Sequence, residues 1–197
     1  MIPVLLAFRV RRTPSHSQEP ARWGLLWEHF FHLKDLLRER TLRLTACGVS
    51  FFWFAATLIA LLLVQVAQVM TDDRSAQAEL SGFLLVWVGL GIAAGSVIVG
   101  VISTNRIELG LIPLGGLGMA IGCVAVALPW IDLGGWVFNA LMFWIGVSSA
   151  VFLVPLNAYL QDLVEPAKRG RQLAASGLMD SLGRFFGIIV QYVLLKM

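Results

Sequence analysis

The last apolar segment of the sequence carries the side chains whose types and spacing best suit binding chemistry. Asp180 and Arg184 are four residues apart, so on an α-helix they share a face, one turn from each other. Ser176 and Gln191 fall on the same side, and apolar residues occupy most of the other. This polar stripe fits a cavity wall that contacts a polar or zwitterionic substrate. Two alternatives stay open: an internal ion pair that only orients the helix, and a helix that lies on the membrane surface without spanning it.

Other reactive side chains do not form a recognisable constellation. The sequence has no Ser/His/Asp set, no paired carboxylates on one face and no phosphate-binding loop, so we expect no catalytic residues and no cofactor. His29 and His32 have a spacing that can bind metal but no further ligands, and Cys47 and Cys123 lie in separate apolar runs, so no metal site is expected. Trp53 lies well inside its apolar run, where core packing competes with a role in lining a substrate path.

The composition indicates where these residues lie. The chain has 197 residues, of which 58% are hydrophobic and 14% are charged. Soluble domains average about 45–50% apolar and about 25% charged residues. There are too few charges to cover the apolar surface, which argues against a soluble enzyme, a disordered chain and a nucleic-acid-binding protein. The composition therefore predicts a membrane protein.

Charge-free runs predict the membrane spans. Four such runs lie near 44–71, 80–105, 109–131 and 133–161. Each is long enough to cross a bilayer as a helix, which takes about 20 apolar residues, and none shows the alternation of a β-barrel strand. A fifth span is predicted near 172–195, interrupted by Asp180 and Arg184. The fold class is therefore an all-α polytopic membrane protein with about five transmembrane helices in a membrane domain at 44–197. Small residues four apart, at Gly91 and Gly95 and at Gly118 and Gly122, predict closely packed helices.

The N-terminal part of the sequence, residues 1–43, differs in pattern from the apolar runs that follow it. Residues 1–8 are apolar but too short to span, and basic residues follow them, which is the reverse of a signal peptide. We interpret 1–21 as the end of a truncated helix plus a cytoplasmic linker. Residues 22–43 show helical periodicity with aromatic and basic side chains, which predicts an amphipathic interfacial helix; a connector packed on the protein's own helices is equally open. Because eight of the 15 basic residues lie in 1–43, we expect the N-terminal side to be cytoplasmic.

Three stretches resemble a known family. Residues 36–54, with Phe-Trp-Phe at their end, are similar to the linker helix and seventh span of Major Facilitator Superfamily transporters. Residues 95–113, ending Arg-Ile-Glu-Leu-Gly-Leu-Ile-Pro, are similar to the turn between spans eight and nine. Residues 154–175, which contain Leu-Val-Glu-Pro-Ala-Lys-Arg-Gly-Arg, are similar to the end of span ten and the basic loop after it. The chain thus resembles the C-terminal half of such a transporter, closest to bacterial lysophospholipid transporters, some of which are fused to acyltransferase domains.

The resemblance implies a partial half-bundle, spans seven to eleven, that works by alternating access in the bacterial inner membrane. It implies a fragment of a longer protein, with a missing N-terminal transporter half, the lipid bilayer and a small amphipathic solute as partners and no nucleic acid. The candidate residues for the substrate path are Asp180, Arg184, Ser176, Gln191 and Trp53. The candidate residues for the cytoplasmic gating loops are Arg106, Glu108, Lys168, Arg169 and Arg171.

Three functions follow from these observations. The first is part of a secondary transporter, not an enzyme, for lysophospholipid or another amphipathic solute. The second is the membrane portion of a fused phospholipid-remodelling acyltransferase, whose chemistry would lie downstream of residue 197. The third is a membrane scaffold that transports nothing.

Overall fold

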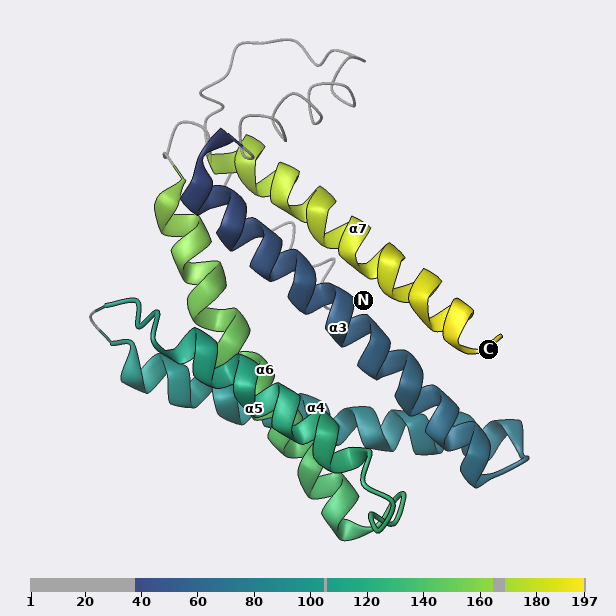
Figure 1. Ribbon diagram of the computed structural model, residues 1–197. Helices are drawn as coiled ribbons and strands as arrows, with labels where there is room; N and C mark the ends of the chain where they lie inside the picture. Colours follow the sequence, from purple (N-terminus) through teal and green to yellow (C-terminus); the bar gives the residue numbers. More distant parts are fainter. Residues whose placement is uncertain (1–37, 105, 165–168, 197) are drawn as a thin grey trace, which may run out of the picture.

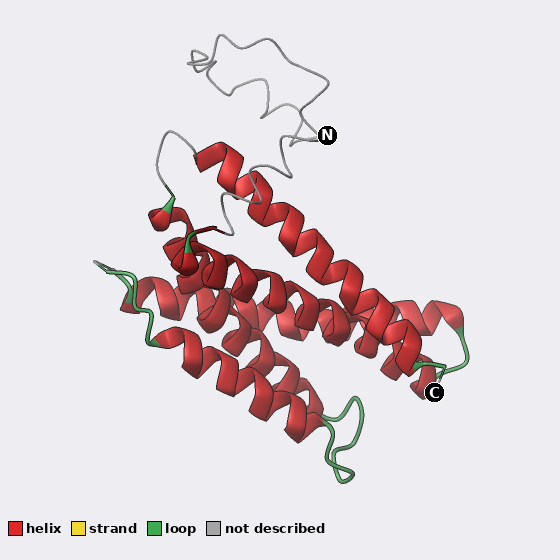
Figure 2. Cartoon of the chain, turned by 45° about the horizontal axis from the view of Figure 1, so that its top comes forward, coloured by secondary structure: helices red, strands yellow, loops and turns green. Residues whose placement is uncertain are grey.

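A computed structural model describes residues 38–104, 106–164 and 169–196, without the side chain of Arg171. In these ranges the chain forms five helices and no strand. The helices are α3 (Arg40–Met70), α4 (Arg74–Ile102), α5 (Leu111–Val126), α6 (Trp136–Leu163) and α7 (Arg169–Leu194). Loops in the described ranges connect α3 to α4 and α5 to α6 (Figure 2). The tail predicted at 1–21 and most of the interfacial helix predicted at 22–43 lie outside the described residues.

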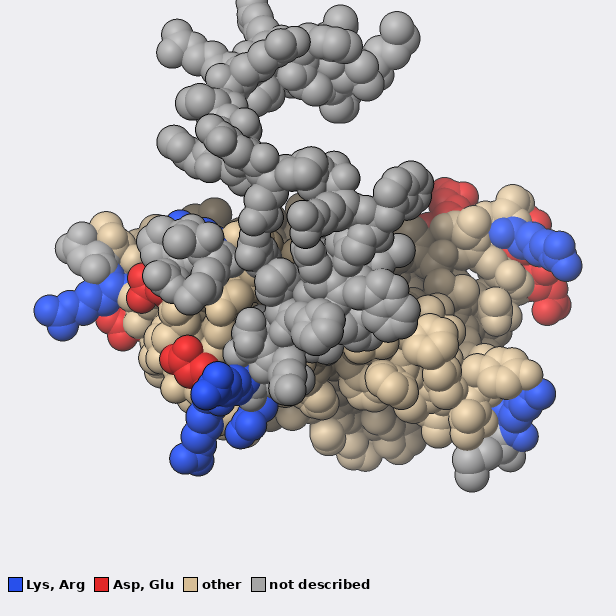
Figure 3. Space-filling view, turned by 90° about the horizontal axis from the view of Figure 1, so that it is seen from above, with Lys and Arg blue, Asp and Glu red and all other residues tan. Residues whose placement is uncertain are grey.

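The described helices have the dimensions and surface of membrane spans. Four helical segments are long and apolar enough to cross a membrane, namely Arg40–Met70, Arg74–Ile102, Trp136–Leu163 and Gln172–Leu194. The shorter α5 has 16 residues, about 24 Å at about 1.5 Å per residue. On the face seen in Figure 3, charged side chains gather at the two ends, and the described surface visible between them is mostly uncharged. Large apolar side chains are exposed along all five helices, as expected for contact with lipid.

Local hydrogen bonds and backbone conformation determine where the helices begin and end, which the apolar runs alone do not predict. The α4 helix begins at Arg74, before the charge-free run at 80, because Asp73 caps it. The Asp73 carboxylate accepts hydrogen bonds from the backbone N–H of Ser75 at 3.1 Å and from its hydroxyl at 2.8 Å. These hydrogen bonds, the one from the hydroxyl first, hold the pKa of Asp73 below its ordinary value. The α5 helix ends at Val126, and the loop that follows includes Gly134, whose φ of 79° suits glycine.

The α6 helix connects the two hydrophobic cores of the bundle. Its residues Phe138, Met142 and Ile145 pack with Leu63 of α3 and Leu84 of α4. Nearer its C-terminus, Leu156 and Leu160 pack with residues from the start of α3 and from α7, namely Leu42, Ala46, Val49 and Ala175. Figure 1 shows α3 and α7 running side by side, while α4, α5 and α6 form the other part of the bundle.

Glycines bring the helix backbones together. A Cβ added at Gly91 would meet the carbonyl oxygen of Phe143 on α6, and one added at Gly95 would meet that of Val147. The predicted close packing at Gly91 and Gly95 is therefore confirmed. The second predicted pair, Gly118 and Gly122, is confirmed too: with Gly115, these glycines pack directly against α6.

The contact between α7 and α3 repeats the contact between α4 and α6. A Cβ added at Gly183 or Gly187 of α7 would meet the carbonyl oxygen of Ser50 or Phe54 of α3. Gly183 and Gly187 of α7 correspond to Gly91 and Gly95 of α4, which lie 92 positions earlier in the sequence. In the same way, Ser50 and Phe54 of α3 correspond to Phe143 and Val147 of α6, which lie 93 positions later. The pair α3–α4 therefore corresponds to the pair α6–α7, and each second helix packs on the first helix of the other pair.

Burial follows the same correspondence. The four buried residues of α4 are Leu84, Gly91, Gly95 and Val99. Their equivalents in α7, 92 positions later, are Ser176, Gly183, Gly187 and Gln191, which are all buried as well. Five buried residues of α3 have buried equivalents in α6, 93 positions later. The pairs are Thr45 and Phe138, Val49 and Met142, Phe52 and Ile145, Leu63 and Leu156, and Ala67 and Leu160. Four of the five described helices, α3, α4, α6 and α7, thus form two copies of one packing unit.

Candidate functional site

The polar stripe of α7 faces α3. Ser176 and Gln191 are only 3% and 4% exposed. The opposite side of α7 is exposed and apolar, with Leu182, Phe185, Ile189 and Val193 on the outer surface. The α7 helix therefore buries Ser176 and Gln191 against protein, leaves Asp180 half-buried and Arg184 exposed, and directs these apolar side chains towards the surrounding lipid.

Close packing of the two helices brings Arg184 to Trp53. Because Gly183 has no side chain, α7 approaches α3 closely enough for the Ser50 hydroxyl to donate a hydrogen bond of 2.6 Å to the carbonyl oxygen of Met179. About one turn along α3 from Ser50 stands Trp53. The centre of its ring lies 3.9 Å from the guanidinium carbon of Arg184. Such a cation–π contact contributes about 0.5–1 kcal/mol at exposed sites and about 2 kcal/mol when water is excluded. The predicted residues Arg184 and Trp53 therefore meet, although they are far apart in sequence.

Acceptor atoms in the same stripe have no donor. The Oδ1 atom of Asp180, one turn before Arg184, is shielded from solvent and has no hydrogen-bond partner among the described residues. The buried Oε1 atom of Gln191 is in the same situation. Asp180 stands eleven residues into α7, about 16 Å from its start, so it lies near the middle of the helix. The stripe thus combines unpaired acceptors with a guanidinium group held on an aromatic ring, an arrangement that can bind a ligand with both donor and anionic groups.

The predicted loop residues lie away from this stripe. Arg106 and Glu108 are exposed in the turn between α4 and α5, and Arg169 is exposed at the first residue of α7. Lys168 and the side chain of Arg171 lie outside the described residues. The structure therefore assembles Asp180, Arg184 and Trp53 and keeps Arg106, Glu108 and Arg169 at the ends of the helices. Within the described ranges, no group of three His, Cys, Asp or Glu side chains is placed to hold a metal ion.

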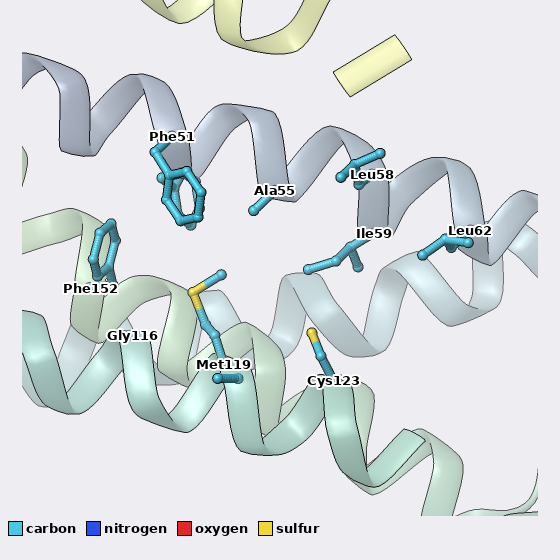
Figure 4. A pocket seen from close by; sticks show the side chains of 11 residues that line it. Phe51, Ala55, Leu58, Ile59, Leu62, Gly116, Met119, Cys123 and Phe152 are labelled. Atoms are coloured by element: carbon cyan, nitrogen blue, oxygen red, sulfur yellow. The ribbon is translucent and has the colours of Figure 1, made fainter. Parts of the chain in front are cut away.

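Sequence reasoning missed an apolar pocket on the other side of α3. The pocket has a volume of about 340 Å³ and lies between α3 and α5, with Phe152 of α6 at one end (Figure 4). Its lining includes three small residues, Ala55, Gly116 and Ala120, among bulkier ones. In the sequence such residues read as ordinary parts of apolar spans, because only the packed helices show which of them face each other.

Comparison with known proteins identifies the family. The model of the Major Facilitator Superfamily matches residues 1–188. No curated protein and no solved structure matches the chain. The two copies of one packing unit fit this family, because each half of its transporters contains nested structural repeats. The chain therefore belongs to the Major Facilitator Superfamily, and its described helices form part of the all-α membrane bundle of such a transporter.

Proposed function

We propose that this part of a secondary transporter moves a small amphipathic solute, a lysophospholipid in the first instance, past Asp180, Arg184 and Trp53. Family membership supports a transporter and not an enzyme. The choice of solute and of these residues is our own inference, and it rests on the chemistry of the α3–α7 contact.

The comparison of α7 with α4 carries the proposal. At the positions equivalent to Ser176, Asp180, Arg184 and Gln191, α4 has Leu84, Val88, Ile92 and Val99. The α4 helix makes the same glycine contact with its partner helix using apolar residues alone. A charge near the membrane centre costs about 2.5–3.5 kcal/mol on insertion scales. The two charged residues in the middle of α7, Asp180 and Arg184, are therefore costly, and the packing does not require them. A solute in the path is a reason to keep them.

The polar groups match a zwitterionic head. A carboxylate such as that of Asp180 binds an ammonium group, and a guanidinium group such as that of Arg184 binds a phosphate with two parallel hydrogen bonds. Trp53 adds an aromatic surface beside Arg184. A zwitterionic lysophospholipid such as lysophosphatidylethanolamine carries an ammonium and a phosphate group on its head and one apolar tail. The resemblance of residues 154–175 to the lysophospholipid transporters points to the same class.

The setting of the proposed path follows from the mechanism of the family. Transporters of this family rock two halves about a site near the middle of the bilayer. We infer that an N-terminal half encloses the site opposite α3 and α7, that the protein lies in a bacterial inner membrane, and that the N-terminal side is cytoplasmic. The candidate gating residues Arg106, Glu108, Lys168, Arg169 and Arg171 then lie in cytoplasmic loops.

The test measures uptake by cells that produce the protein. Asp180→Val and Arg184→Ile convert the stripe to the residues that α4 carries, so both variants should reach the membrane at normal levels. We expect each to lower the uptake of a fluorescent lysophosphatidylethanolamine at least tenfold. The matched control is Phe185→Leu, which changes an exposed apolar side chain next to Arg184 and should leave uptake unchanged. Full uptake by both charge variants would refute the role of the stripe.

Competition defines the solute class. Unlabelled lysophosphatidylethanolamine should suppress uptake, whereas glycerophosphoethanolamine, which has the head without the tail, and a free fatty acid should not. Suppression by the head alone would show that the solute is polar and not amphipathic.

A further inference from the structure

Another cavity lies where α3 ends and α4 begins. It has a volume of about 390 Å³ and is lined by Thr71, Ala76, Glu79, Leu80 and Phe83. We call it the hairpin cavity, because Figure 1 shows the loop that joins α3 to α4 at one end of the bundle. All its lining residues lie between the end of α3 and the first three turns of α4. The cavity is therefore separate from the apolar pocket beside α5 and from the proposed solute path on α7.

The hairpin cavity favours a cation. Glu79 is the one charged residue of its lining, and within the described ranges no hydrogen bond or ion pair engages the Glu79 carboxylate. Thr71, the C-cap residue of α3, lines the same cavity, so the negative end of that helix dipole lies there too. The last turn of α3 has no basic residue. Arg74 stands five residues before Glu79, which places it on the other side of α4.

An apolar stripe continues from the carboxylate along α4. Phe83, Val86 and Leu90 follow Glu79 at steps of four, three and four residues, so they share its side of the helix. These three side chains are 50%, 55% and 51% exposed. From Glu79 to Leu90 the stripe runs for about 16 Å at about 1.5 Å per residue. It therefore offers a narrow apolar track on which one acyl chain can lie, with the carboxylate at its upper end.

The depth of Glu79 matches the head-group layer of a bilayer. The α4 helix has 29 residues, about 43 Å at about 1.5 Å per residue, which equals the about 40–45 Å of a bilayer with its head groups. Since the hydrocarbon core takes up about 30 Å of this, it begins about 7 Å from the start of the helix. Glu79 lies five residues after Arg74, again about 7 Å along the axis. The carboxylate thus stands where lipid head groups meet acyl chains.

We propose that the hairpin cavity and the apolar stripe bind one phosphatidylethanolamine molecule of the surrounding leaflet. The Glu79 carboxylate accepts charge-assisted hydrogen bonds from its primary ammonium group. The hydroxyl oxygen of Thr71 accepts a hydrogen bond from the backbone N–H of Asp73 at 3.3 Å, and its own hydrogen is left to donate to the phosphate. One acyl chain then lies along the stripe. The proposal does not depend on the proposed solute.

The same features discriminate between lipid heads. Phosphatidylglycerol is anionic, so the Glu79 carboxylate and the end of α3 repel it. Phosphatidylcholine carries a quaternary ammonium group, which has no N–H to donate and is recognised by cages of several aromatic rings. Phe83 is the one aromatic residue of the lining, so the hairpin cavity has no such cage. Phosphatidylethanolamine should therefore bind in preference to both.

Photo-cross-linking in vesicles tests the proposal. The full chain is placed in phosphatidylcholine vesicles that contain a trace of a phosphatidylethanolamine probe with a diazirine in its acyl chain. Parallel samples contain phosphatidylcholine or phosphatidylglycerol probes with the same chain. After illumination, mass spectrometry quantifies and locates the label within residues 75–106, the fragment that trypsin releases. The matched control is Glu108→Gln, which removes an exposed carboxylate beyond the other end of α4.

We expect the phosphatidylethanolamine probe to label the stripe at least fivefold more than the phosphatidylcholine probe. Glu79→Gln should abolish this preference, and Glu108→Gln should retain it. Glu79→Lys should reverse the charge selectivity, so that the phosphatidylglycerol probe labels more than the phosphatidylethanolamine probe, while circular dichroism shows an unchanged helix content. Equal labelling by the phosphatidylethanolamine and phosphatidylcholine probes, a preference that survives Glu79→Gln, or label that misses the stripe would each overturn the proposal. None of these readouts involves solute uptake, so the proposed function is tested separately.

Discussion

Replacing Gly183 by alanine is the most direct test of the α3–α7 contact. The added methyl group would meet the carbonyl oxygen of Ser50 and would lie 2.8 Å from its hydroxyl oxygen, so α7 must move outward by on the order of 1 Å to restore ordinary contact. Overpacking of this kind costs about 1–3 kcal/mol. The shift also weakens the hydrogen bond from Ser50 to Met179, and interhelical hydrogen bonds in membranes contribute about 0.6 kcal/mol on average. Alanine returns at most about 1 kcal/mol through its higher helix propensity.

The net expectation is a loss of about 1–3 kcal/mol in the free energy of unfolding. The matched control is Gly177→Ala on the same helix, because a Cβ there has no atom within 4 Å. This control should be neutral or slightly more stable than the wild type. Unfolding with sodium dodecyl sulfate in mixed micelles, followed by far-UV circular dichroism, measures both variants. Equal unfolding midpoints for the two alanine variants would refute the close packing of α7 on α3.

Three further predictions concern other parts of the bundle. Ser75→Ala removes a hydrogen bond to the Asp73 carboxylate and should raise the pKa of Asp73 towards its ordinary value, which NMR titration of the carboxyl carbon measures. Because the folded-state pKa is depressed, the contribution of this cap is present above about pH 4 and is lost as the pH falls through the folded-state pKa; a pKa that stays unchanged in the variant would contradict the assignment. Trp144→Phe removes the hydrogen bond to Gly118 and should lower the stability by about 0.6–1.7 kcal/mol in the same detergent titration, whereas an unchanged midpoint would show that this bond is not formed. Gly146→Ala would press a methyl group against the backbone of α4 and should destabilise the bundle by about 1–3 kcal/mol, so a variant as stable as the wild type would rule out that backbone contact.

The sequence predicts the class of the fold well and the ends of the helices less well. Long apolar runs are sufficient to indicate membrane helices, since the bilayer imposes their length. The ends depend on local hydrogen bonds: Asp73 and Arg74 are charged and lie outside the apolar run, yet Asp73 caps α4 and the helix begins beside it. Glycine spacing is informative for the same reason as the apolar runs, because it reports a local requirement for close approach.

Part of the candidate site likewise follows from the sequence, and part of it depends on how the helices pack. That Asp180 and Arg184 share a face follows from their spacing of four residues, and the structure adds that this face lies on α3. The contact of Arg184 with Trp53 depends on how two distant helices pack, which their spacing in the sequence does not encode. The internal repeat is hidden for a related reason. Equivalent positions share burial but not residue type, as Ser176 and Leu84 show, so the correspondence appears only once the contacts are known.

The two copies of the packing unit differ most where Trp53 stands in place of Gly146. In the α4–α6 copy, a Cβ on Gly146 would meet the carbonyl oxygen of Val88, so the helices are joined through their backbones and no charge is involved. In the α3–α7 copy, the Trp53 ring occupies the equivalent position and Arg184 lies over it. A cation–π contact weakens when an anion competes for the guanidinium group, whereas a backbone contact between apolar helices does not respond to charge. Under the proposed function, a phosphate-bearing head that draws Arg184 from Trp53 therefore alters the α3–α7 contact and leaves the α4–α6 contact intact, which places the response to the solute in one copy of the repeat.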